Sequence, residues 1–283
     1  MLGYRPTALG IVMKYLCSTA VLPAFSIKSP QLLADLQSHD IGLKELADRL
    51  KLDPGLGARL LHIANSPFFG VCRQISSLNE AVIVLGLNQT RALVQVEIIR
   101  SNLSALPWDK GQMQRFWQRS LYMAACCQAL ANRVGASEST AFTVGIFHNL
   151  GILMMAQTHA LPYEQLLADC TLGAALAEQE MELFQVDHGV MGAELLQSLN
   201  FPDNICDAIA MQYRRSLDDG SNVLSSLLGT AQLLSDYEQW SEFSQACPNR
   251  LMTQFNLCEQ SHTRVKQYID GVSSAWFKLA GAI

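Results

Sequence analysis

The 283-residue sequence has little charge and lacks the short motifs that mark several large protein classes. Charged residues make up 16% of the chain and hydrophobic residues 49%, so it can bury a substantial core and is not expected to be disordered. It contains neither a GxxxxGK[ST] nor a GxGxxG pattern, which argues against the common phosphate-cradling loops. No CxxC pair occurs among its eight cysteines, so neither a zinc site nor a thioredoxin-like site is indicated.

The sequence also lacks a net positive charge and a clear membrane-spanning run. Its formal net charge is −5, so nucleic acid is not expected as a partner. Residues 8–25 are apolar enough to resemble a signal peptide, but Lys14 interrupts them. The most apolar later run, residues 141–156, contains His148 and Asn149 and is too short to span a bilayer. We therefore expect a cytoplasmic protein that does not enter a membrane.

Helical periodicity dominates the chain, and no alternating pattern typical of a β-strand is present. Pro107 and the polar stretch Ser216–Asn222 interrupt this pattern most clearly. The expected divisions are a helical part over residues 1–107, a helical bundle over 108–215 and a helical C-terminal extension over 216–283. Within the bundle, the expected helices run from Asp109 to about Val134, from Ser137 to about Ala156, from the N-cap Asp187 to Leu199, and from Pro202 to about Arg214.

Several segments, taken in order, resemble the HDOD family over about residues 20–215. Each segment is short, but their order along one chain is specific. The strongest runs from Ala58–Leu61 into Ala64–Gly70. The longer segments are Leu22–Phe25, Leu43–Ala47, Asp53–Leu56, Ala58–Leu61, Ala64–Gly70, Ile75–Leu78, Phe116–Trp117, Gly145–Gly151, Asp187–Gly189 and Phe201–Pro202. Shorter matches lie between or after them: Ala81–Val82, Leu85–Gly86, Ser120, Ala141–Phe142, Gly192–Ala193, Ile205 and Ala208–Ile209.

The resemblance implies an all-α fold: an HD-like helical bundle preceded by an N-terminal helical subdomain and followed by a C-terminal extension. It also implies a regulatory output role in bacterial signalling, and a relationship to the HD and HD-GYP metal-dependent phosphohydrolases. Those enzymes hold divalent ions with His and Asp side chains, because the ions polarise phosphate and lower the pKa of an attacking water.

This chain departs from the metal-binding pattern at its centre. The adjacent His-Asp pair of the enzymes reads His148-Asn149 here, and an amide ligand carries no charge. Paired histidines of the family correspond to Gln212-Tyr213, the first helix of the bundle offers Ser120 in place of a histidine, and the later aspartate aligns near Gln232. The expectation is a vestigial HD-like cluster without catalytic residues, made of His148, Asn149, Asp187 and His188.

Two readings of that cluster remain open. His148, Asp187 and His188 are candidate ligands for a divalent metal such as Mn, Fe or Mg, since two imidazoles and one carboxylate can bind a transition metal. Alternatively, Asp187 caps a helix, His188 is a satisfied histidine at the helix start, and His148 donates to a backbone carbonyl in the core. The second reading is preferred, so no cofactor is expected.

A second candidate site is the loop that follows the N-terminal helix ending at Asn65. Pro67 forbids simple continuation of that helix, and Phe68 and Phe69 supply two rings. Either Asn65 caps carbonyls while the rings fix the loop to the core, or the loop forms a surface for a ligand or partner. Its candidate residues are Asn65, Ser66, Phe68 and Phe69.

Three functions are compatible with these patterns. The first is a non-catalytic bacterial signal-transduction module that binds a protein partner, such as a receiver, diguanylate cyclase or phosphodiesterase module. The second is a divergent metal-dependent phosphohydrolase acting on a nucleotide or cyclic dinucleotide. The third is a small-molecule sensor that uses the former active-site cleft. The eroded ligand positions favour the first.

Overall fold

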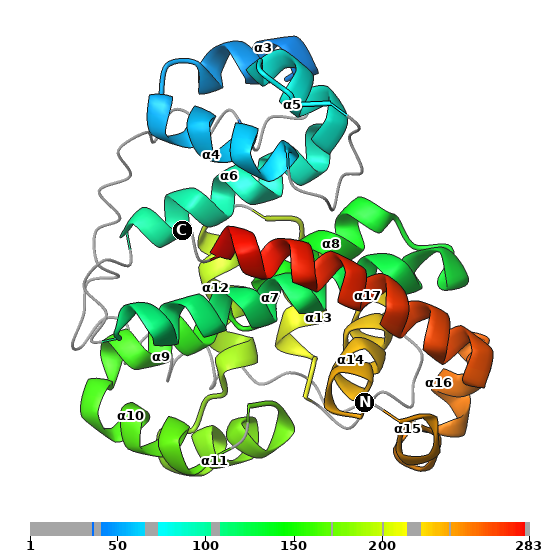
Figure 1. Cartoon of the computed structure of the whole chain (residues 1–283). Helices are drawn as coiled ribbons and strands as arrows, with labels where there is room; N and C mark the ends of the chain where they lie inside the picture. Colours follow the sequence, from blue (N-terminus) through cyan, green and yellow to red (C-terminus); the bar gives the residue numbers. More distant parts are fainter. Residues whose placement is uncertain are drawn as a thin grey trace.

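The computed structural model describes Leu36 and residues 41–65, 73–102, 108–170, 172–199, 201–213, 222–237 and 239–280. Over these ranges the regular structure is entirely helical, with no strand, which confirms the all-α prediction (Figure 1). Ser66, Phe68 and Phe69 of the candidate loop lie outside the described residues.

The N-terminal part contains α3 (Leu43–Leu50), α4 (Pro54–Ala64), α5 (Leu78–Leu85) and α6 (Leu87–Asn102). Local signals fix their ends. The Asp53 carboxylate accepts from the backbone N–H of Leu56, and the Ser77 hydroxyl accepts from that of Glu80. Helices α3, α4 and α5 pack on one another, and α6 joins them to the bundle by packing against α8.

The bundle contains α7 (Lys110–Ala131), α8 (Glu138–Phe147), α9 (Leu150–Thr158), α10 (Ala160–Asp169), α11 (Ala174–Phe184), α12 (His188–Ser198) and α13 (Asp203–Ala210). Asp109 and Gln112 form a capping box at the start of α7, and a short 3-10 turn (Asn132–Val134) ends at Gly135 in the left-handed region. The predicted helix from Asp109 to about Val134 is thus confirmed, whereas α13 ends four residues before the predicted Arg214.

The C-terminal extension folds back onto the bundle. It contains α14 (Val223–Asp236), α15 (Trp240–Ala246), α16 (Asn249–Gln254) and α17 (Glu259–Ala280). Helix α17 packs along α7, and α14 packs against both α7 and α13 (Figure 1). The extension therefore helps to enclose the region where the site lies.

The single helix predicted from Ser137 to Ala156 is wrong, because the chain breaks at His148–Asn149 into α8 and α9. The Gly145 carbonyl receives a hydrogen bond from the His148 ring, and the His148 carbonyl receives one from the Gln212 side chain. Two side chains thus donate to backbone carbonyl oxygens that would accept backbone N–H groups in a continuous helix. At the break, His148 and Asn149 contact Gln212 and Tyr213, which follow α13.

The stretch Glu138–Thr158 is long and apolar enough to cross a membrane, but 89% of its most apolar window is buried inside the protein. It is accordingly the core of the bundle. Its backbone lies very close to its neighbours: a Cβ on Gly145 would lie 2.6 Å from the carbonyl oxygen of Met123, and one on Gly151 would lie 2.7 Å from the backbone nitrogen of Gly192. These glycines allow α8 to approach α7 and α9 to approach α12, which brings His148 near His188.

Candidate functional site

His148 and Asn149 occupy the break between α8 and α9, and both are buried. The Nδ1–H of His148 donates to the Gly145 carbonyl oxygen at 2.7 Å. Burial lowers the pKa of His148 to about 3, since it penalises the charged imidazolium. The Gln212 side-chain amide donates to the His148 carbonyl oxygen at 2.7 Å, which ties the end of α13 to the break.

His188 begins α12 and is fully buried, with its helix capped by Asp187, whose carboxylate accepts from the Val190 backbone N–H at 2.9 Å. The partner of His188 is the buried Glu180 of α11. One Glu180 carboxylate oxygen accepts both the His188 backbone N–H at 2.7 Å and the His188 Nδ1–H at 2.6 Å. The other oxygen accepts from the hydroxyl of Tyr163, a buried residue of α10. Three donors thus satisfy one carboxylate that has no exposure to water.

Glu180 was not identified from the sequence. It shares the buried face of α11 with Leu176 and Ala177. A glutamate on the apolar stripe of an amphipathic helix is unusual, because ionised side chains are rarely buried without partners. The position of Glu180 among apolar residues was therefore the sequence signal that could have identified it as part of the site.

The Tyr213 hydroxyl joins the two histidine-bearing helices. It lies 3.0 Å from His188 Nε2 and 3.4 Å from the Asn149 side-chain oxygen. The Gln232 amide of α14 donates to it at 3.1 Å, and to the Gln212 side-chain oxygen at 3.2 Å. Burial raises the pKa of Tyr213, so its hydroxyl stays protonated.

We refer to His148, Asn149, Glu180, Asp187, His188, Gln212, Tyr213 and Gln232 as the polar cluster. Of the residues predicted from sequence, His148, Asn149 and His188 are joined through Gln212 and Tyr213, and Asp187 lies at the adjoining helix start. Ser120 on α7 is buried, and its hydroxyl has no hydrogen-bond partner among the described residues.

The donors of the polar cluster are a poor fit to a divalent metal. Metal ions need imidazole lone pairs and carboxylate oxygens directed at one point. Here Nε2 of His188 faces the Tyr213 hydroxyl while its Nδ1 pairs with Glu180. The bond from His148 Nδ1 to Gly145 does not engage Nε2 of His148, so the misfit rests on His188 and on the uncharged amide of Asn149. Within the described ranges no group of three or more His, Cys, Asp or Glu side chains is arranged to hold a metal ion. No catalytic step is assigned to the cluster.

Asn65, in the second candidate site, makes three hydrogen bonds to backbone. Its side-chain amide donates to the carbonyl oxygens of Leu61 and Ile75, each at 2.8 Å, and its oxygen accepts from the Ile75 N–H at 2.6 Å. Asn65 therefore caps the end of α4 and links it to Ile75, on the far side of the candidate loop in the sequence. The cap is what the capping interpretation expects.

Glu180→Gln is expected to destabilise the protein by about 2–4 kcal/mol, because the amide presents an NH₂ group to donors and leaves one of them unpaired in the core. Glu182→Gln, on the exposed side of the same helix, is the matched control and should change stability by less than about 0.5 kcal/mol. Urea unfolding measures both. Equal, small effects of the two substitutions would contradict the structural role given to Glu180.

The free energy of unfolding is expected to decrease as the pH is lowered, because His148 gains a proton more readily in the unfolded chain than in the folded protein. Its pKa falls from 6.5 in the unfolded chain to about 3 in the folded protein, so over this window the unfolded state binds a proton that the folded state does not. The resulting loss approaches about 1.4 kcal/mol per pH unit and vanishes above the unfolded pKa.

His148→Gln keeps an amide donor for Gly145 but removes this titration. Urea unfolding between about pH 6.5 and 4.5 gives the free energy of unfolding as a function of pH. The slope of that free energy against pH should be smaller for the variant, by an amount that corresponds to close to one bound proton. The other titratable groups are the same in both proteins, so their contributions to the two slopes cancel. Identical slopes for both proteins would rule out a buried, uncharged His148.

Known proteins share this architecture. A crystal structure of a candidate phosphohydrolase from Shewanella amazonensis SB2B matches with a TM-score of 0.73 and 23% identity, covering 95% of this chain and 97% of that one. An HDOD domain protein of unknown function from Geobacter sulfurreducens matches with a TM-score of 0.71 and 20% identity, covering 98% and 97%. A candidate signal transduction protein from Marinobacter aquaeolei VT8 matches with a TM-score of 0.74 and 18% identity, covering 95% of this chain and 61% of that one.

At these identities the similarity shows the fold, and it confirms the HD-like helical architecture. No curated protein matches the sequence. The model of the HDOD domain family matches residues 22–215, which is more than half of the chain and agrees with the resemblance found in the sequence. The chain therefore belongs to the HDOD family.

Proposed function

We propose that this protein is a non-catalytic, cytoplasmic module of bacterial signal transduction that acts by binding a protein partner. The family and the Marinobacter structure, described as a candidate signal transduction protein, support a signalling role. The Shewanella structure, described as a candidate phosphohydrolase, makes hydrolysis the main alternative.

The observation that carries the proposal is the pairing of His188. Phosphoester hydrolysis by the HD chemistry requires ring nitrogens and carboxylates that are open to metal ions and activate a water. In this chain Glu180 and Tyr213 take both ring nitrogens of His188, and Asn149 replaces a charged ligand. The polar cluster then serves to join α9, α11, α12, α13 and α14 through hydrogen bonds between their side chains.

A partner surface on the candidate loop completes the proposal. A pair of hydrogen bonds joins Asn65 to Ile75, and the candidate loop lies between these two residues in the sequence. Ser66, Phe68 and Phe69 are the residues we assign to partner contact. Aromatic side chains supply much of the binding energy at protein interfaces. The partner class is a receiver, diguanylate cyclase or phosphodiesterase module.

The absence of catalysis is tested with bis(p-nitrophenyl) phosphate and a cyclic dinucleotide, each assayed with added Mn²⁺ or Fe²⁺. We expect the rate of the purified protein to equal that of the His148→Ala variant, since no water is activated in the cluster. Turnover that depends on metal and is abolished by His148→Ala would show that the protein is a phosphohydrolase.

The partner surface is tested by titrating the protein with receiver, diguanylate cyclase and phosphodiesterase modules from the same genome. Replacing both Phe68 and Phe69 by Ser should weaken binding at least about tenfold, because two apolar anchors are lost. Leu161→Ser is the control, since Leu161 is 74% exposed and lies on α10, at the opposite end of the molecule from α4 (Figure 1). Equal losses in both variants would contradict the assignment of the loop, and no binding by any module would contradict the partner class.

A further inference from the structure

A cavity of about 370 Å³ lies where the N-terminal helical part meets the bundle. Its walls come from α6, from α8 and from the start of α13, and α8 packs against both of the other helices. The volume is within the range of small-molecule sites, roughly 300–1,000 Å³. The cavity shares no described lining residue with the polar cluster or with the candidate loop.

The side chain of Gln95, on α6, is a buried amide that lines this cavity. Gln95 is only 6% exposed, and its side chain makes no hydrogen bond with another residue in the part of the chain that the structure describes. A buried amide without a partner is costly, so such groups are normally satisfied. The carboxamide offers a donor and an acceptor side by side. A ligand that carries an acceptor beside a donor would satisfy both.

Other polar side chains at the cavity are bonded within the protein. The Asn88 amide donates to the Ser139 hydroxyl at 3.1 Å, which joins α6 to α8 at the edge of the cavity. The Thr143 hydroxyl donates to the Ser139 carbonyl oxygen at 2.9 Å. These bonds leave Gln95 as the buried polar group that the cavity itself must satisfy.

The charges around the cavity favour an uncharged ligand. Arg91 is the only charged residue among the described residues that line it. Its guanidinium donates to the Ile41 carbonyl oxygen at 3.4 Å, and it has a further interaction within the chain, so we assign it no ligand contact. An ion loses its hydration when it enters such a cavity, and no carboxylate among the described lining residues would compensate a ligand cation.

Apolar side chains provide the remaining walls. Phe201 and Ile205, at the start of α13, are each 6% exposed, and the small Ala92 lies on α6 one turn before Gln95. The Phe201 ring packs edge to face with Phe147, at a centroid distance of 5.2 Å, which fixes its position. A flat, largely apolar ring with one polar edge matches these walls together with the amide.

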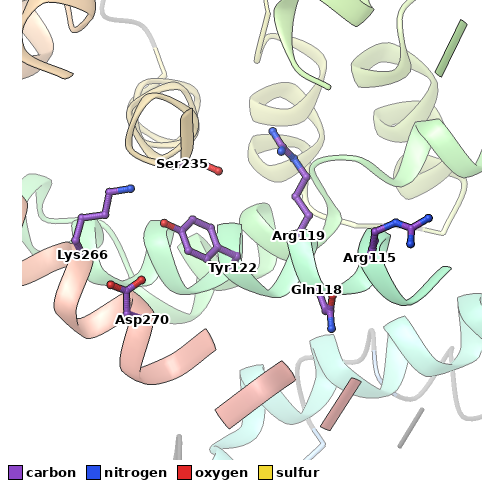
Figure 2. Close-up of a pocket in the computed structure, with 7 residues that line it drawn as sticks. All are labelled: Arg115, Gln118, Arg119, Tyr122, Ser235, Lys266 and Asp270. Atoms are coloured by element: carbon purple, nitrogen blue, oxygen red, sulfur yellow. The ribbon is translucent and has the colours of Figure 1, made fainter. Parts of the chain in front are cut away.

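A larger cavity of about 490 Å³, between α7, α14 and α17, lacks such convergence (Figure 2). Figure 2 shows that Arg115 and Arg119 point away from Lys266. Arg119 also lies 3.8 Å from Asp236. The charged groups of that cavity therefore do not meet at one point, and we assign no ligand to it.

We propose that the cavity between α6, α8 and α13 binds an uncharged heteroaromatic base of the adenine type. The Gln95 amide accepts a hydrogen bond from the exocyclic amino group and donates one to the adjacent ring nitrogen. Glutamine recognises adenine in nucleic acids by this bidentate pairing. The ring of the base packs against Phe201 and Ile205. The site goes beyond the protein-binding role, because it gives the module a small-molecule input.

A ligand in this position contacts both helical parts of the protein. Gln95 lies on α6, which packs against α4, and Asn65 of the candidate loop follows α4. On the other side, Phe201 packs against Phe147, which directly precedes His148. Binding therefore links the N-terminal part to the bundle near the polar cluster.

The test is equilibrium dialysis of the full chain with adenine and with purine, which lacks only the exocyclic amino group. We expect adenine to bind and purine to bind at least about tenfold more weakly, because the Gln95 amide oxygen is left without a donor. Gln95→Leu should weaken adenine binding at least about tenfold, since both amide contacts are lost. Gln89→Leu, a half-buried position of α6 outside the described cavity lining, should leave the affinity unchanged.

Three results would overturn the proposal. One is no adenine binding up to about 5 mM, beyond the millimolar range of weak specific ligands. Another is equal affinity for adenine and purine, which would show that the amide does not recognise the polar edge of the base. The third is equal adenine affinity in Gln95→Leu and Gln89→Leu, which would place the ligand elsewhere. The purine comparison uses the unchanged chain, so it decides the matter even if Gln95→Leu does not fold. Partner binding is measured separately, so failure here leaves the proposed signalling role standing.

Discussion

One buried carboxylate determines how the candidate site is built. Glu180 accepts hydrogen bonds from the His188 backbone, the His188 ring and the Tyr163 hydroxyl. A carboxyl group with no access to water is tolerated only when such donors replace its hydration. These bonds fix the turn between α11 and α12 and the orientation of the His188 ring, which leaves Nε2 facing Tyr213. The contacts from Tyr213 to Asn149 and Gln232 depend on that orientation.

The polar cluster differs in kind from a hydrolytic metal centre. A metal centre leaves ligand atoms open and close together, so that ions and water complete the coordination. In this chain the Tyr213 hydroxyl faces the His188 ring, Gln212 donates to the His148 backbone carbonyl, and Gln232 donates to both Tyr213 and Gln212. The fold is shared with the HDOD structures, and within it the polar groups of this chain bond to one another. This arrangement supports a structural role for the cluster within a signalling module.

The parts of the structure that depend on nearby residues could be predicted from the sequence. Helix periodicity predicted the all-α fold, and helices begin after Asp109, Ser137 and Asp187, where the sequence predicted them to start. Asp187 caps its helix, as its side chain indicated. The break at His148 could not be predicted, because the bond from Gln212 comes from 64 residues away. Glu180 was missed because its partner lies across a turn.

The central claim is that the groups of the polar cluster hydrogen-bond to one another and hold no metal ion. Elemental analysis of protein purified without chelators, in parallel with an active HD phosphohydrolase, tests this most directly. The account predicts far less than one Mn, Fe or Mg ion per chain, because the cluster offers too few open charged ligands. One or two tightly held ions per chain, lost on His188→Ala substitution, would contradict it.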